Sequence, residues 1–192
     1  GRTTKIVPTA QDNITLTPST TEWTKENVTV TATGNEETNG YIIQTKLNNG
    51  NWQNTETQIA TAYGDVVYAR LTDGRNIGEE ATITIKNIDK ENPTKTVPTA
   101  VATTNTITVT NKQEDELSGI KKIQYQIKKH SENEWGELQD SNEFTRLIQN
   151  TQYDVRTYVI DNVENDSYSE VYTITTKTVP TAQENITLTT ST

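Results

Sequence analysis

The tetrapeptide Val-Pro-Thr-Ala occurs three times in this chain, starting at Val7, Val97 and Val179. Successive copies lie about 80 to 90 residues apart, which is longer than one repeat of a solenoid and close to the length of one small β-sandwich. The chain is therefore expected to contain successive modules of that size instead of one large globular domain.

The third copy opens a segment that nearly repeats the beginning of the chain. Residues 182–192 follow residues 10–20 almost letter for letter, whereas the sequence after Val97 differs. This pattern predicts two types of module that alternate as A, B, A, and it indicates a longer array. The expected domains are module A at residues 1–94, module B at residues 95–177, and the truncated first strand of a further module at residues 178–192.

Composition also favours small modules. Only 30% of the 192 residues are hydrophobic, and there is one phenylalanine, so the chain is not expected to build one large core. Threonine is abundant instead, and its β-branched, hydroxyl-bearing side chain suits strands that are buried on one face and hydrated on the other.

Segments of alternating apolar and polar residues predict short strands in both modules, and no segment has a convincing helical period. In module A, the turn Asn-Asn-Gly-Asn at residues 48–51 predicts a hairpin that presents Trp52. The predicted fold class is all-β, with tandem sandwiches. The predicted strands are residues 28–32, 41–47, 66–72 and 81–85 in module A, and residues 106–109, 120–128, 144–147, 153–160 and 168–176 in module B.

Module B contains a run from Leu147 to Arg156, Leu-Ile-Gln-Asn-Thr-Gln-Tyr-Asp-Val-Arg, that resembles a fibronectin type III pattern. That pattern is a leucine, a short turn, a tyrosine and then alternating apolar residues. The resemblance implies that the hydroxyl of Tyr153 ties the preceding loop to the strand and that Leu147 packs against this tyrosine. Trp135 departs from the usual place of the family's core tryptophan and is similar to the one that follows the third-strand hairpin in bacterial variants.

Module A is similar to the bacterial immunoglobulin-like repeats of Gram-positive surface proteins and phage proteins. The resemblance is carried by Trp23, by Trp52 and by the closing segment Asn-Ile-Asp-Lys-Glu-Asn-Pro-Thr at residues 87–94. It implies immunoglobulin-like sandwiches in a surface or virion setting. Trp52 and Trp135 are expected to be buried in the cores of their modules.

Prolines flank the predicted joints, at Pro93 and Pro98 before module B and at Pro180 after it. Proline fixes φ and restricts the preceding residue to extended conformations, so the prolines predict short, stiff linkers and an extended rod. The alternative is that they only end edge strands and discourage association between sheets.

Charge and cysteine content limit the partners and the location. Because the net charge is −9, the chain is not expected to bind nucleic acid or anionic membranes. It has no cysteine, which favours a bacterial or phage protein over a disulfide-stapled domain. It has no apolar run long enough to span a bilayer, so no membrane span is expected in these residues. The expected location is extracellular, at the bacterial cell surface or alternatively in a phage virion, with neighbouring modules of the same chain as partners.

The sequence lacks the residue patterns that the common catalytic mechanisms require. His130 is the only histidine and is expected at a solvated hairpin tip, and neither a nucleophile elbow nor a phosphate-binding loop is present. The chain is therefore predicted not to be an enzyme and to need no cofactor. Calcium is a weaker alternative, because residues 161–166 offer several oxygen-bearing side chains in one loop; the competing interpretation is a solvated acidic turn.

Three classes of function fit these observations. The leading class is a non-catalytic stalk of repeats that projects a distal binding domain of an adhesin-type or phage fibre protein. The second is binding of a host glycan or protein by exposed aromatic residues such as Trp23 and Tyr63, because sugar rings stack on flat apolar faces. The third is an accessory spacer of a secreted polysaccharide-degrading enzyme.

Overall fold

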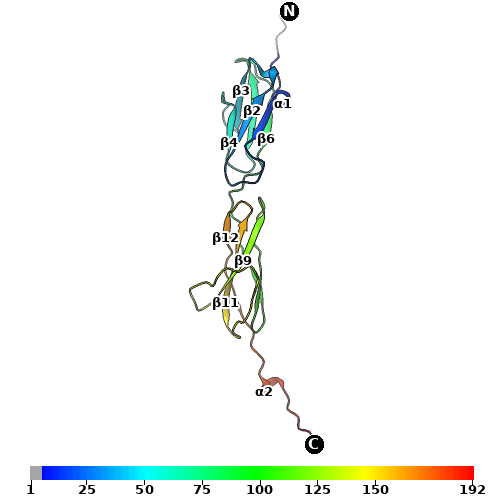
Figure 1. Cartoon of the computed structure of the whole chain (residues 1–192), viewed down its shortest axis with the longest axis vertical. Coiled ribbons are helices and arrows are strands. Elements are labelled where there is room, and N and C mark those ends of the chain that lie inside the picture. Colours follow the sequence, from blue (N-terminus) through cyan, green and yellow to red (C-terminus); the bar gives the residue numbers. More distant parts are fainter. Residues whose placement is uncertain (1–5) are drawn as a thin grey trace, which may run out of the picture. The chain divides into compact units, whose positions relative to one another are not determined.

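The computed structural model describes residues 6–192. Contacts within the chain divide it into two compact units, with the boundary between Glu91 and Asn92. Unit 1 is the part up to Glu91, and unit 2 is the part from Asn92 onward. Within the described residues both units are built from antiparallel strands with a few short helical turns (Figure 1). The fold class is therefore all-β, as predicted.

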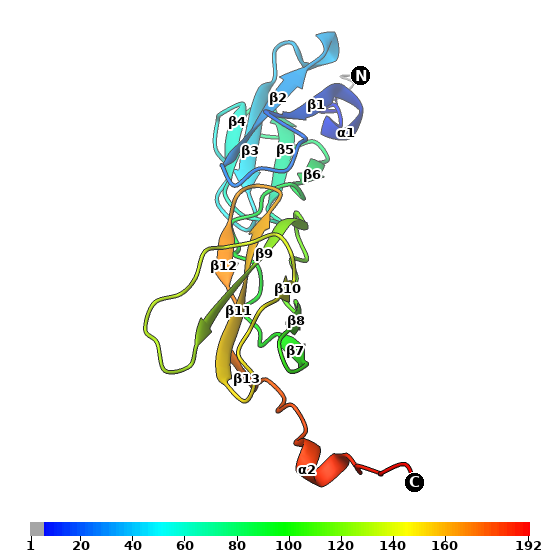
Figure 2. The ribbon, with the colours of Figure 1, turned by 60° about the horizontal axis from the view of Figure 1, so that its bottom comes forward.

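Unit 1 consists of two three-stranded sheets. The first, second and fourth strands form one sheet, and the third, fifth and sixth form the other (Figure 2). This distribution is the arrangement of an immunoglobulin-like sandwich. The elements are α1 (Ala10–Asn13), β1 (Ile14–Pro18), β2 (Val28–Gly34), the 3-10 turn Glu36–Thr38, β3 (Ile42–Leu47), β4 (Thr57–Ala60), β5 (Val66–Thr72) and β6 (Ala81–Thr84).

The two sheets of unit 1 bury small apolar side chains between them. In β2, Val28 and Val30 are buried and alternate with threonines. In β5, Val67, Ala69 and Leu71 are fully buried, and the residues between them face the other side of the sheet. This period of two places one face of each strand in the core, which is why these segments form strands.

Unit 2 has the same two-sheet plan. One sheet has the order β10-β8-β7, and in the other β11 pairs with β9, β12 and β13. Because β12 and β13 pair with successive parts of β11, they are two halves of one edge strand. The elements are β7 (Thr99–Ala102), β8 (Ile107–Thr110), β9 (Ile120–Lys129), β10 (Glu143–Phe144), β11 (Gln152–Asp161), β12 (Asp166–Tyr168), β13 (Tyr172–Thr175) and α2 (Ala182–Asn185).

The core of unit 2 lies between these two sheets and includes the tyrosine singled out in the sequence. Tyr153 is buried, and its hydroxyl accepts a hydrogen bond from the backbone N–H of Ile148 at 3.0 Å. Leu147 is partly buried and packs against the same cluster. The hydroxyl thus satisfies a donor of the loop that enters β11. The buried cluster is Ala102, Ile107, Val109, Phe144, Tyr153 and Val155.

Each unit binds its own side of the boundary segment. In unit 1, the N–H of Asp89 donates to the carbonyl of Thr24 at 2.8 Å. In unit 2, the carbonyl of Pro93 accepts a hydrogen bond from the hydroxyl of Ser167 at 2.7 Å. Residues 90–92 lie between these two anchored positions, so the connection is only three residues long.

The prolines of the predicted joints have different surroundings. Pro93 and Pro98 are buried within unit 2, whereas Pro180 is exposed. The segment around the first two prolines therefore belongs to the body of unit 2 and is not a separate linker.

The C-terminal segment, residues 178–192, forms no strand in this structure. It contains the helical turn α2 and continues as extended chain, where a first strand of a further module was predicted. A strand needs a neighbouring strand to bind its N–H and C=O groups. Within the described residues, none pairs with this segment.

Candidate functional site

The surface of unit 2 carries a stack of aromatic and cationic side chains on the β9–β11 sheet. Arg156 alternates with the buried residues of β11 and so lies on the face opposite the core. Its guanidinium carbon is 4.2 Å from the ring centroid of Trp135 and 3.9 Å from that of Tyr168. Its Nε donates a 2.9 Å hydrogen bond to the side-chain oxygen of Gln126. The amine of Lys128 lies 5.5 Å from the Trp135 centroid.

Unit 1 has a corresponding stack, formed by the same residue types at other positions of the chain. The guanidinium carbon of Arg70 is 4.1 Å from the Trp52 centroid, and its Nε donates to the side-chain oxygen of Gln44 at 2.8 Å. The amine of Lys46 lies 5.0 Å from the Trp52 centroid and 4.8 Å from that of Tyr68. Planar guanidinium groups stack well on indole rings, because the ring face is electron-rich.

The register of the two stacks is identical. Gln44 lies opposite Arg70 across β3 and β5, and Gln126 lies opposite Arg156 across β9 and β11. In each unit a lysine follows the glutamine by two residues, and a tryptophan follows later in the loop after that strand. We name this set of arginine, glutamine, lysine and tryptophan the outer-face stack. The Gln-x-Lys pattern followed by tryptophan was visible in the sequence, but its pairing with an arginine required the strand register.

The outer-face stack corrects the expectation for the two tryptophans. Trp52 and Trp135 are half-buried, and neither belongs to a core cluster. The prediction that both are buried in the cores of their modules is wrong. The reason is that each tryptophan comes from a loop that folds back onto the outer face of its sheet, where an arginine covers one face of the ring.

An ionic network lies beside the outer-face stack of unit 2. Asp154 is buried, and its carboxylate contacts the amine of Lys128 and Nδ1 of His130, each at 2.8 Å. The hydroxyl of Thr173 donates to the same carboxylate at 2.7 Å. Burial acts to raise the pKa of Asp154, but the hydrogen bonds from Lys128, Thr173 and His130, together with the charge of Lys128, lower this pKa to about 2.

This network is not arranged as a nucleophile with its base. The hydroxyl of Thr173 is directed to Asp154 and not to His130. A catalytic triad needs its hydroxyl on the imidazole. The side chain of His130 is 54% exposed, as expected for a hairpin residue, yet it also pairs with Asp154, which the sequence analysis missed.

The two aromatic residues named as possible ligand contacts lie together in unit 1. The rings of Trp23 and Tyr63 are parallel within 6°, with centroids 6.2 Å apart. Trp23 is 38% exposed and Tyr63 is 48% exposed. They come from segments forty residues apart in the sequence, so the sequence did not indicate that they would stack.

The loop proposed for calcium uses its first aspartate to hold the turn. Asp161 is buried, and one of its oxygens accepts hydrogen bonds from the N–H groups of Val163 and Asn165 at 2.9 and 2.8 Å. Its other oxygen accepts from the side-chain amide of Asn165 at 2.8 Å. In unit 2, an oxygen of Asp115 lies within 4.8 Å of one of Asp161. Calcium binding by this loop stays a prediction.

The other acids of this loop bind protein donors. Glu164 forms an ion pair with Lys121. Asp166 accepts a hydrogen bond from the hydroxyl of Tyr158, and this bond raises the pKa of Tyr158 to about 12. The contacts favour the interpretation of the loop as a hydrogen-bonded acidic turn.

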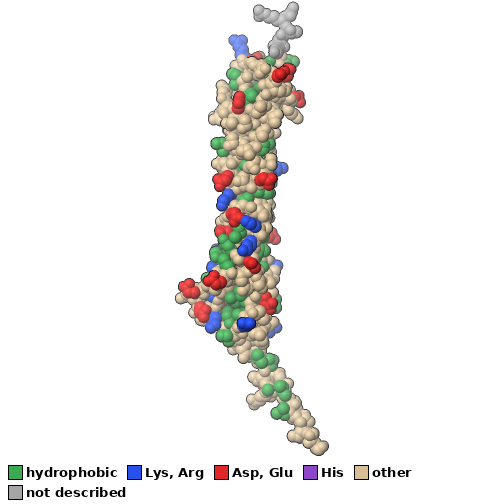
Figure 3. All heavy atoms as spheres, viewed as in Figure 1, with side chains coloured by type: hydrophobic (Ala, Val, Ile, Leu, Met, Phe, Trp, Pro, Cys, Tyr) green, Lys and Arg blue, Asp and Glu red, His purple; other side chains and the backbone are tan. Residues whose placement is uncertain are grey.

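The molecular surface has no extended region of one charge on the face drawn in Figure 3, where acidic and basic side chains are interspersed. Within residues 6–192, no helix is long and apolar enough to cross a lipid bilayer.

No protein-family model matches the chain, and no curated protein matches it in sequence. Among solved structures, the chain is similar to the FN1–FN3 domains of chicken CNTN1, with 12% identity and a TM-score of 0.36, over 90% of this chain and 69% of that chain. It is also similar to domains A168–A170 of titin, with 13% identity and a TM-score of 0.42, over 86% of this chain and 66% of that chain.

The ionic network makes the stability of unit 2 dependent on pH, with a loss of stability in acid. The folded pKa of Asp154, about 2, is below its ordinary value of 3.8, so its stabilisation is present above the ordinary value and is lost as pH falls toward 2. Asp154→Asn is expected to lower the free energy of unfolding of unit 2 by about 2–3 kcal/mol at neutral pH. The difference from wild type should shrink in acid. Asp140→Asn is the control, because that side chain is 78% exposed; a pH-independent difference would contradict the assignment.

The outer-face stack predicts that lysine will not replace its arginines. Arg70→Lys and Arg156→Lys keep the charge but lose the planar stacking and the Nε hydrogen bond, so each unit should lose about 1 kcal/mol of unfolding free energy. Denaturant titration measures this, and quenching of tryptophan fluorescence by acrylamide should increase. Arg75→Lys, in an exposed turn, is the matched control. An equal loss in all three variants would mean that the stacks contribute nothing.

Proposed function

We propose that this chain is a non-catalytic structural spacer made of immunoglobulin-like and fibronectin type III-like modules. The observation that carries the proposal is the boundary between the units. Unit 1 binds the chain up to Asp89, and unit 2 binds it from Pro93, so little chain is left to act as a tether.

The composition supports the same proposal. Each unit has its own small core, and the chain has no cysteine. The side chains of His130 and Asp154 and the polar residues around them make structural contacts. We place the chain outside the cell, as stalk repeats of a bacterial surface protein or of a phage fibre that project a distal binding domain. Its partners there are neighbouring modules of the same chain. A spacer of a secreted polysaccharide-degrading enzyme would use the same modules.

Distances between spin labels on the two units test the spacer role. The chain has no cysteine, so Thr33→Cys on β2 and Lys122→Cys on β9 give two exposed labelling sites, one in each unit. The expected result is a narrow distribution of distances by pulsed electron paramagnetic resonance. A flexible Gly-Ser insertion after Asn92 is the control and should broaden the distribution. If the uninterrupted chain already gives the broad distribution, the units are freely tethered and the proposal is wrong.

A second candidate function rests on the parallel pair of Trp23 and Tyr63 in unit 1. The two rings are stacked and each is more than one third exposed, so the pair offers aromatic surface to solvent, and pyranose rings stack on such surface. We therefore propose glycan binding at this pair as the alternative role.

An NMR titration with chitohexaose as the probe tests this alternative. The indole N–H signal of Trp23 is expected to shift, while those of Trp52 and Trp135, which are covered by arginines, serve as internal controls. Tyr63→Phe keeps the ring and should retain the shift, whereas Tyr63→Ala should lose it. A Trp23 signal that does not move, or that moves equally in Tyr63→Ala, argues against binding of this probe at the pair.

A further inference from the structure

The C-terminal segment of the chain is a second copy of the segment that completes unit 1. Residues 178–192 differ from residues 6–20 at three positions. The differences are Thr178 for Ile6, Glu184 for Asp12 and Thr190 for Pro18. Of the five residues of β1 that pair with β2, Ile14–Pro18, only Pro18 is changed in the copy.

The two segments also have the same local conformation. The residue before α1, Thr9, has φ −70° and ψ 138°, and the residue before α2, Thr181, has φ −75° and ψ 139°. The side-chain amide of Asn13 donates to the carbonyl of Thr9 at 2.8 Å, and that of Asn185 donates to the carbonyl of Thr181 at 3.0 Å. The C-terminal copy is therefore preorganised in the shape that the first copy has when it is bound to unit 1.

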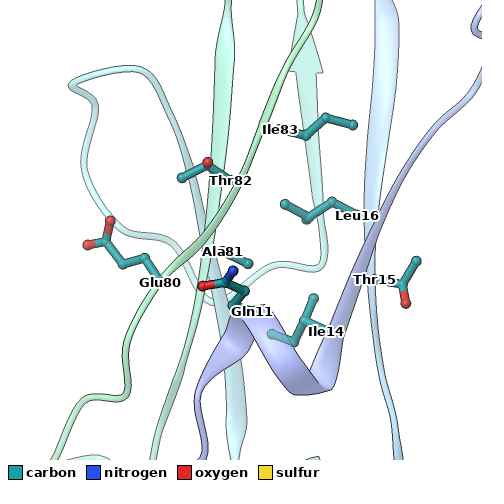
Figure 4. A pocket seen from close by; sticks show the side chains of 8 residues that line it. All are labelled: Gln11, Ile14, Thr15, Leu16, Glu80, Ala81, Thr82 and Ile83. Carbon is teal, nitrogen blue, oxygen red and sulfur yellow. The ribbon is translucent and has the colours of Figure 1, made fainter.

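In unit 1, β1 is an edge strand that pairs with β2. On its other side there is a groove of about 460 Å³ instead of a strand ladder (Figure 4). Ile14 and Leu16 of β1 line this groove with Ala81 and Ile83 of β6. Replacement of β1 therefore breaks one ladder and leaves the rest of both sheets in place.

Further contacts that attach this segment to unit 1 use groups that the copy also has. Ala10 N–H donates to the carbonyl of Glu79 at 2.9 Å, and the side-chain amide of Asn35 donates to Asn13 at 3.0 Å. The N–H of Thr29 donates to the hydroxyl of Ser19 at 3.1 Å. The corresponding residues of the copy are Ala182, Asn185 and Ser191.

The apolar side chains of the copy are not covered. Ile14 is 7% exposed in unit 1, whereas Ile186 is 60% exposed and Leu188 is 93% exposed. Hydrophobic side chains appear along the C-terminal segment in Figure 3. The copy thus carries the side chains that fill the unit 1 site, in the right conformation and without a partner strand within the described residues.

We propose that residues 178–192 of one chain take the place of β1 in unit 1 of a second copy of this chain, as an exchanged strand, once the β1 of that second copy is weakened or released. The copy would pair with β2 in the register of β1, with Ile186 and Leu188 in the positions of Ile14 and Leu16. The contact is head-to-tail, because each chain offers a strand at one end and an acceptor in unit 1. Such contacts extend into open chains unless a ring closes.

In the unaltered protein, the chain's own β1 occupies its site in unit 1 in preference to the C-terminal segment of another molecule. Its covalent attachment gives it an effective concentration on the order of millimolar, so a strand from another molecule at lower concentration does not displace it. Exchange is expected when β1 is weakened or released, in the manner in which an added strand completes an open sheet.

The test weakens β1 in the full chain and follows size by light scattering after gel filtration. Ile14→Asp/Leu16→Asp should form concentration-dependent, head-to-tail oligomers under conditions in which the wild type is monomeric. Adding Ile186→Asp and Leu188→Asp to that variant should return it to monomer, because the donor strand is then also disabled. A weakened chain that stays monomeric at every concentration overturns the proposal, and so do oligomers that persist in the fourfold variant.

A peptide experiment separates strand exchange from aggregation of an unfolded unit 1. A synthetic peptide of residues 178–192, added to the fourfold variant, should restore the cooperative thermal transition of unit 1. The same peptide with aspartate at positions 186 and 188 is the control and should have no effect. If neither peptide restores the transition, residues 178–192 do not fit the β1 site.

Discussion

The structure of each unit depends on a thin apolar layer between two sheets, to which the central strands β5 and β11 contribute fully buried side chains. Their inward side chains, Val67, Ala69 and Leu71 in β5 and Val155 and Val159 in β11, are fully buried. Burial of such side chains stabilises by about 1.5–3 kcal/mol for each valine or leucine. With no cysteine to cross-link the sheets, correct register of these strands decides whether a unit folds, since a one-residue slip would expose the whole layer.

The outer-face stack supplies a second constraint on that register. In each unit the arginine lies on the central strand, the glutamine lies opposite it on the third strand, and the tryptophan arrives from the loop that follows the third strand. A slip of one residue would turn the arginine into the core, where its charge would be desolvated. The stack therefore favours the correct strand register on the outer face of the sheet, and the apolar layer favours the same register on the inner face. Its presence in both units, whose sequences differ, indicates a requirement of the sandwich and not of one ligand.

The sequence predicted the strands that alternate most regularly and missed the contacts that join distant segments. The segment 66–72 was predicted as a strand and is β5, because every second residue in it is apolar. Trp52 and Trp135 were placed in the cores on the basis of a predicted hairpin and of family resemblance, although a tryptophan in a loop can be covered by an arginine from a strand that follows much later. Likewise the pairing of His130 with Asp154, and that of Trp23 with Tyr63, depends on which loops meet after folding. Local periodicity in the sequence carries no information about contacts between loops that are distant in the sequence.

The difference between the first strands of the two units has a physical consequence for a chain built from tandem sandwiches. Each sandwich begins with an edge strand that pairs with one neighbour, and neighbouring modules that share the same first strand are prone to exchange it during folding. In this chain the first strand of unit 2, Thr99–Ala102, differs in sequence from Ile14–Pro18 of unit 1. An incoming copy of β1 therefore matches the acceptor in unit 1 and not the one in unit 2. The distance along the chain between interchangeable strands is thereby doubled, which lowers the probability that they meet before each module has closed on its own strand.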